Sequence, residues 1–176
     1  MVKGDCFLCP GETQRTLYYI TDVRGNKCDA LRIYINPTQV QGLEYASEYD
    51  IDLPSDVIVM PTTMYAIIKQ LMRECVEEIH KILQSEALNV EFDIEENSHY
   101  TNGKYIYTMT HLKDERWHFN LFRVECENIS PDWTGDAKAD DFKDYLRPIT
   151  NDTFEKVQQC FNNLQEKIAH HLEQKS

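Results

Sequence analysis

Hydrophobic side chains recur every three or four residues along two long stretches of the chain. In the first stretch they are Met64, Ile67, Ile68, Leu71, Met72, Cys75, Ile79, Ile82 and Leu83. In the second they are Phe154, Val157, Cys160, Phe161, Leu164, Ile168 and Leu172. This spacing gives each segment one apolar face, which is typical of helices that pack on a core. The pattern predicts two long helices, over about 62–84 and 152–173.

Other stretches alternate apolar and polar side chains, as half-buried strands do. Residues 17–35 predict a β-hairpin around Gly25-Asn26, because these residues readily adopt the positive φ of a tight turn. The apolar run at 57–60 and the alternation at 90–94, 105–110 and 116–124 predict four more strands. From 130 to 147 we expect a loop-like acidic stretch, with a short helix within 137–146.

Residues 36–56 carry Pro37, Gly42 and Pro54 with little periodicity. They predict a long surface loop, suited to be a lid or a partner-binding insertion. We find no internal repeat and no domain boundary in the sequence. The chain therefore predicts a single α+β domain over residues 1–176, with a largely antiparallel sheet, two long helices, a long loop at 36–56 and a C-terminal helix.

Charge narrows the choice of partners. The 176 residues carry a formal net charge of −12, which repels phosphate backbones and anionic lipid surfaces. Direct nucleic-acid binding and membrane binding are therefore disfavoured, and an acidic protein with a basic partner remains open. The start of the chain, MVKGDCFLCPG, lacks the apolar core of a signal peptide. We expect a cytoplasmic or otherwise intracellular protein.

The string Cys6-Phe-Leu-Cys9, followed by Pro10-Gly11, is the most specific motif in the chain. Two thiolates at this spacing can bind one Zn²⁺ at about 2.3 Å each, and two further ligands must come from distant residues. The candidates are Cys28, Cys126, His99, His111 and His118. The alternatives are plain thiols and a redox pair, of which the redox pair is the weaker because the motif does not open a helix within a βαβ unit.

Residues 4–16, GDCFLCPGETQRT, resemble the cysteine-rich opening of galactose-1-phosphate uridylyltransferases, in which a similar stretch helps to hold zinc. These enzymes belong to the histidine-triad superfamily, where a strand ending in proline leads into a helix, as residues 56–61 do here. A later strand carries closely spaced histidines, one of which attacks the α-phosphate of a nucleotide. The resemblance implies that His118 is the catalytic nucleophile. Arg116 and Asn120 then occupy ligand-binding positions where histidines or a glutamine are expected.

Strand alternation places His118 and Asn120 on one face and Trp117, Phe119 and Leu121 on the other. The simpler alternative for His118 is a structural histidine that hydrogen-bonds to Tyr105 or Tyr107. The cations that could receive an anionic ligand are Arg15, Arg32, Arg116 and Arg123.

Acidic residues concentrate in two segments. Glu91, Asp93 and Glu95 form the first, and Asp132, Asp136, Asp140, Asp141 and Asp144 form the second. They are either a solvated surface or, together, an imitation of a phosphate backbone.

Two hypotheses follow from the sequence. The first is a small zinc-containing domain that resembles histidine-triad proteins and binds a nucleotide or another phosphorylated ligand, as a degenerate nucleotidyl hydrolase or transferase or as a binding domain. Its metal is on Cys6 and Cys9, and its phosphate is at His118, Arg116 and Asn120. The second is a non-enzymatic acidic interaction protein, an inhibitor or adaptor, that binds a basic protein partner.

Overall fold

One antiparallel sheet and two long helices make up most of the described chain. The computed structural model describes residues 1–10, 15–35, 43–52, 56–125 and 128–173. The strands are β1 (Cys6–Pro10), β2 (Arg15–Arg24), β3 (Lys27–Ile35), β4 (Leu43–Asp52), β5 (Ile58–Met60), β6 (His99–Thr101), β7 (Tyr105–Lys113), β8 (Arg116–Glu125), β9 (Asn128–Ala137) and β10 (Arg147–Ile149). The helices are α1 (Met64–Glu86), α2 (Ala139–Phe142), the 3-10 turn η1 (Lys143–Tyr145) and α3 (Asn151–Glu173). The predicted α+β class and both predicted long helices are confirmed.

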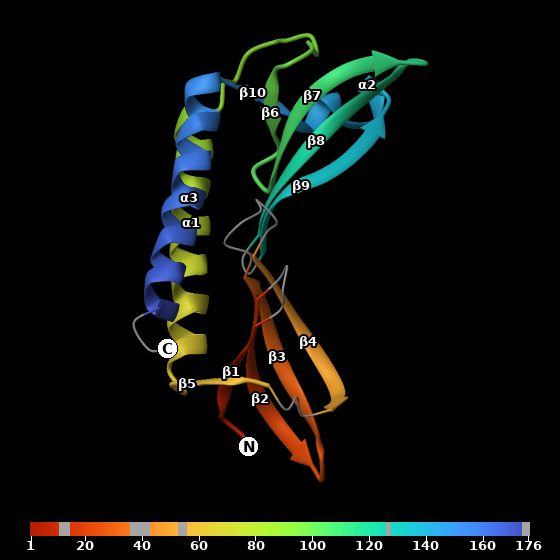
Figure 1. Cartoon of the computed structure of the whole chain (residues 1–176). Coiled ribbons are helices and arrows are strands. Elements are labelled where there is room, and N and C mark those ends of the chain that lie inside the picture. Colours follow the sequence, from red (N-terminus) through yellow and green to blue (C-terminus); the bar gives the residue numbers. More distant parts are fainter. Residues whose placement is uncertain (11–14, 36–42, 53–55, 126–127, 174–176) are drawn as a thin grey trace.

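The two halves of the sheet have equivalent strand orders. From each outer edge inward, the fifth strand of that half comes first and is followed by its first, second, third and fourth strands. The full order is β10-β6-β7-β8-β9-β4-β3-β2-β1-β5. Each half of the chain contributes five strands and then a helix of 23 residues. The halves meet in the sheet where β4 pairs with β9, through Leu43 opposite Ile129 and Glu44 opposite Asn128 (Figure 1). The structure therefore contains a repeat that the amino-acid sequence does not reveal.

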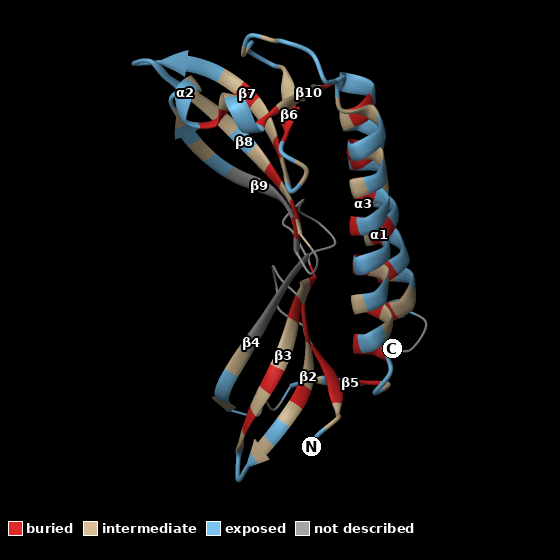
Figure 2. Cartoon of the chain, turned by 180° about the vertical axis from the view of Figure 1, so that it is seen from behind, coloured by how far each residue is buried: buried red, intermediate tan, exposed pale blue. Residues whose placement is uncertain are grey.

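Helices α1 and α3 lie side by side along one face of the sheet and close the main core (Figure 1). Figure 2 shows that both helices are buried toward the sheet and exposed on the outside. Phe161 of α3 meets Phe122 of β8 edge-on, with ring centroids 5.7 Å apart. Thr150 caps α3, because its hydroxyl accepts a hydrogen bond of 3.1 Å from the backbone N–H of Thr153. Within the described residues, no helix has the length and apolar character needed to span a membrane.

The opposite face of the C-terminal half holds a second, smaller core. Its buried side chains are Tyr100, Met109, Phe142 and Leu146, and partly buried aromatic and aliphatic side chains pack around them. Phe142 belongs to α2 and Leu146 follows η1, so these two short helical turns cover this face of the sheet. A short helix within 137–146 was expected, and α2 with η1 confirms it.

The strand predicted at 90–94 is wrong. Residues 87–98 include no strand, although Phe92 and Ile94 do turn toward the second core. The Tyr100 hydroxyl donates to the backbone carbonyl of Asp93 at 3.1 Å and accepts from the backbone N–H of Glu95 at 3.0 Å. The Tyr100 side chain thus supplies hydrogen-bond partners for backbone groups that a neighbouring strand would otherwise satisfy. The segment therefore keeps its alternation of buried and exposed side chains without belonging to the sheet.

The prediction of a long loop at 36–56 is wrong for the middle of this segment, because Leu43–Asp52 forms strand β4. Residues 36–42 and 53–55 lie outside the described part. In the same way β9 occupies Asn128–Ala137, within the stretch expected to be loop-like. Both strands are rich in acidic and small polar residues, so their alternation is weak. They form because β3 and β8 offer partners across the sheet.

Candidate functional site

Cys6 and Cys9 lie on one strand but on opposite faces of the sheet. Both belong to β1, where residues three apart point in opposite directions. Cys6 is buried in the main core beneath the long helices, whereas Cys9 packs on the other face with Phe7, Tyr18 and Cys28. The structure therefore does not bring the two thiols together as a chelating pair.

Burial also disfavours the thiolate form that zinc requires. It raises the pKa of Cys6 to about 11 and raises the pKa of Cys9 above its ordinary value. Of the candidate further ligands, Cys28 is buried. His99 belongs to β6 in the C-terminal half, whereas Cys6 and Cys9 belong to β1. Cys126 lies outside the described residues. Among the described residues, no three His, Cys, Asp or Glu side chains are grouped so that they could hold a metal ion.

His118 and Asn120 share a face of β8, as the alternation predicts, and Trp117 and Phe119 turn to the second core. Directly across from His118 are His111 of β7 and Asp136 of β9. The imidazoles of His111 and His118 stack, with ring centroids 4.4 Å apart and ring planes 8° apart. Three polar side chains thus stand in a row across three adjacent strands.

Neither tyrosine proposed as a partner of His118 occupies that role. The Tyr105 hydroxyl donates to Glu125 at 3.1 Å, and Tyr107 packs against the rings of Phe119 and Phe142. The neighbour that sequence reasoning did not place beside His118 is His111. The two-residue turn Asp114-Glu115 pairs Lys113 with Arg116 and so brings position 111 opposite position 118, but it contains no glycine or asparagine to mark it in the sequence.

The arginines expected to receive an anionic ligand are paired with carboxylates. Arg116 donates from Nε to the Asp136 carboxylate and from Nη2 to the Asp136 backbone carbonyl at 3.2 Å. This contact lowers the pKa of Asp136. Arg32 pairs with Glu48 and Arg123 pairs with Glu125. The side chain of Arg15 lies outside the described residues. Because each of these described cations already has an acidic partner, they do not converge on an open phosphate site.

The two acidic segments meet on the outside of the second core. We call this the acidic surface, and its described members are Glu91, Asp93, Glu95, Glu96, Asp140, Asp141 and Asp144. All are exposed. Lys143 of η1 joins the segments, because its Nζ lies 3.0 Å from the carboxylate of Asp93. Of the other acids in the predicted second cluster, Asp136 lies beside His118 instead, and the side chain of Asp132 lies outside the described residues.

The acidic surface is held in place from beneath. Phe92 and Ile94 insert into the second core beside Phe142 and Leu146, and Phe92 stacks on Tyr100 with ring centroids 5.2 Å apart. The charged neighbours of Phe92 and Ile94 therefore point outward. An open pocket of about 420 Å³ lies next to them, and it is lined by Glu91, Phe92, Asp93, Glu95, Ser98, His99, Tyr100, Pro148 and Ile149.

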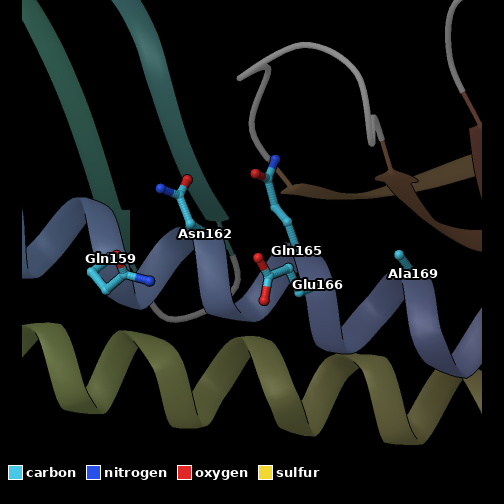
Figure 3. Close-up of a pocket in the computed structure, with 5 residues that line it drawn as sticks. All are labelled: Gln159, Asn162, Gln165, Glu166 and Ala169. Atoms are coloured by element: carbon cyan, nitrogen blue, oxygen red, sulfur yellow. The ribbon is translucent and has the colours of Figure 1, made fainter.

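A second open pocket, also of about 420 Å³, lies along α3 (Figure 3). Its lining is Gln159, Asn162, Gln165, Glu166 and Ala169. Three carboxamides and one carboxylate offer hydrogen bonds but neither a nucleophile nor a set of metal ligands. This pocket therefore does not favour a catalytic function.

Comparisons of the chain with protein-family models, with curated proteins and with solved structures find no match.

Proposed function

We propose that the protein is a non-enzymatic interaction protein that binds a basic polypeptide segment on its acidic surface. One observation carries the proposal: two acidic segments that are distant in the sequence lie together on one exposed face and are anchored by a shared apolar core. Lysine and arginine side chains of a partner would meet several carboxylates there at once. Charge complementarity of this kind mainly sets association rate and specificity.

Lys143 bridges these segments in the described part of the chain, and its ion pair with Asp93 is weak. Asp93 is 94% exposed and Lys143 is 38% exposed in their ion pair. An exposed pair of this kind contributes only about 0–1 kcal/mol, because water and salt screen it. A cation of the partner can therefore replace Lys143 at little cost in stability.

An aromatic side chain lies next to the acids. Tyr145 of η1 is 74% exposed and follows Asp144 directly. Exposed tyrosine is enriched in protein interfaces, since it supplies a large contact area and a hydroxyl for little loss of side-chain entropy. The pocket beside Glu91 and Asp93 adds a recess of about 420 Å³ into which a long basic side chain fits.

The alternative proposal, a phosphorylated ligand at His118, has less support. Such a ligand needs a cation to neutralise its charge, and Arg116 already donates to Asp136. The acidic surface needs no such rearrangement, apart from displacement of the half-buried Lys143 from Asp93.

The test is the affinity for an oligoarginine peptide, measured by isothermal titration calorimetry at low salt. Changing Glu91, Asp93 and Asp144 together to Lys should weaken binding at least tenfold, which corresponds to about 1.4 kcal/mol. The single change Lys143→Ala should strengthen binding, because it removes the competing internal cation. Raising the salt to physiological strength should weaken binding by the wild-type protein, since these charges are exposed.

The matched control keeps the same change in net charge but places it on the long helices. Glu74, Glu77 and Glu155 are exposed acids of α1 and α3, and their triple change to Lys should leave most of the affinity. If both triple variants lose affinity equally, the peptide responds only to net charge and the proposed surface is wrong.

A further inference from the structure

We propose that His111 and His118 together bind a divalent transition-metal ion such as Zn²⁺ at the tip of the β7–β8 hairpin. The two residues are directly opposite each other in the register of the strands. Their rings are nearly parallel, at 8°, with centroids 4.4 Å apart. Neutral imidazole nitrogen is a preferred ligand of Zn²⁺, Cu²⁺ and Ni²⁺, and it lies about 2.0–2.1 Å from a bound zinc ion. Because lone pairs of imidazole nitrogens lie in the ring plane, both rings must turn out of this parallel stack to direct one nitrogen each at a shared ion.

A neighbouring hydroxyl fixes which nitrogen of His111 is available. Thr110 Oγ1 donates its proton to the backbone carbonyl of His118 at 3.0 Å. The same oxygen lies 3.2 Å from His111 Nδ1. Since the hydroxyl proton is already used, the oxygen accepts from Nδ1–H, and the lone pair of His111 is on Nε2. Metal-binding histidines commonly have the other ring nitrogen fixed in this way.

A third potential ligand stands beside the pair but is engaged. Asp136 is directly opposite His118 on β9, and opposite residues of antiparallel strands have Cβ atoms about 4.5–5.5 Å apart. Its carboxylate accepts a hydrogen bond from Arg116. The described residues accordingly offer no group of three ligands in place. We infer a site of two imidazoles with water in the remaining positions, in which Arg116 competes with the metal for Asp136.

The site is open to solvent and independent of the acidic surface. His111 of β7 is exposed and His118 of β8 is half-buried, and both lie on the face of this hairpin away from the second core. The acidic surface lies on the outside of that second core. Loss of peptide binding and loss of metal binding are thus separate results.

The experiment is titration of the full chain with Zn²⁺, followed both by calorimetry and by NMR of the histidine ring protons. We expect the ring signals of His111 and His118 to shift together. Substitution of either residue by Ala should lower the affinity at least tenfold, and Thr110→Val should lower it less, because Val removes only the oriented hydroxyl. Arg116→Gln should raise the affinity, because it releases Asp136 as a third ligand.

The chain provides its own control in the neighbouring pair His170 and His171 on α3, whose rings are 6.4 Å apart and inclined by 63°. Changing both to Ala should leave Zn²⁺ binding at the hairpin intact. Ring signals of His111 and His118 that do not move on addition of Zn²⁺ would overturn the proposal. An unchanged affinity in both single-alanine variants, or a lowered affinity in Arg116→Gln, would do the same. Thermal unfolding of each variant checks that it is folded.

Discussion

Gly135 offers the sharpest test of the packing that supports the acidic surface. It lies on β9 opposite Phe119 of β8. A Cβ atom added at this position would lie 2.8 Å from Phe119 Cε2 and 3.0 Å from Phe119 Cζ. Ordinary contacts of such a carbon begin at 3.4 Å. We therefore predict that Gly135→Ala destabilises the protein through this one ring.

The size of the effect depends on how freely Phe119 can retreat. The ring is confined by Tyr107, whose centroid is 5.1 Å away, and by Phe142, whose centroid is 5.8 Å away. It must move by about 0.6 Å or more, and such overpacking costs about 1–3 kcal/mol. Because Phe142 belongs to α2, movement of Phe119 also shifts the element that carries Asp140 and Asp141. We expect weaker binding of oligoarginine as well as lower stability.

The assay is urea unfolding of four proteins: the wild type, Gly135→Ala, Phe119→Leu and the double variant. Leucine is shorter than phenylalanine and leaves room for the new methyl group. The cost of Gly135→Ala should thus fall by at least about 1 kcal/mol in the Phe119→Leu background. A Gly135→Ala protein within about 0.5 kcal/mol of wild type would refute the reasoning. The same cost in both backgrounds would show that Phe119 is not the obstacle.

Three further predictions concern other parts of the molecule. Thr153 is 1% exposed, and its hydroxyl donates to Glu86 of α1 at 3.0 Å, so Thr153→Val should cost about 1–2 kcal/mol in chemical unfolding. Burial lowers the pKa of His99 below 6.5, so the unfolded chain binds the proton more tightly and the free energy of unfolding should fall as the pH drops from 7 to 5. His99→Gln should make the free energy of unfolding depend less on pH. The same pH dependence in both proteins would contradict the role given to His99. Burial raises the pKa of Cys75 to about 12 and of Cys6 to about 11. Iodoacetamide at pH 8 should therefore label the half-buried Cys9 before Cys6 or Cys75, as followed by mass spectrometry of the peptides. In native mass spectra before and after EDTA, no loss of zinc should depend on Cys9.

The regular elements with strong periodicity were predictable from the sequence. The two helices show an apolar residue at every third or fourth position, and Gly25 has the positive φ expected of the first hairpin turn. Strands β4 and β9 were not predictable in this way, because their acids and small polar residues weaken the alternation. Their pairing partners, which only the folded chain provides, decide their structure.

The candidate sites were likewise predictable only in part. Alternation correctly placed His118 and Asn120 on one face, but the stacking of His111 on His118 depends on the turn at Asp114 and Glu115. Both turn residues have positive φ without being glycine, so the turn lacks its usual sequence signal. The cysteine motif suggested a chelating turn because spacing alone does not distinguish a turn from a strand. In β1 the same spacing separates the thiols.

The mirrored order of the sheet is what duplication and fusion of one gene segment would produce, since two copies of a unit then occupy equivalent places in one chain. A fused pair can keep one copy close to the original while the other acquires new surface features. Here β4 ends at Asp52 and β5 begins at Ile58, whereas α2 and η1 stand between β9 and β10. The acidic surface therefore involves a part in which the two halves differ, because three of its seven carboxylates lie on α2 and η1, and the segment between β4 and β5 is too short to carry such elements.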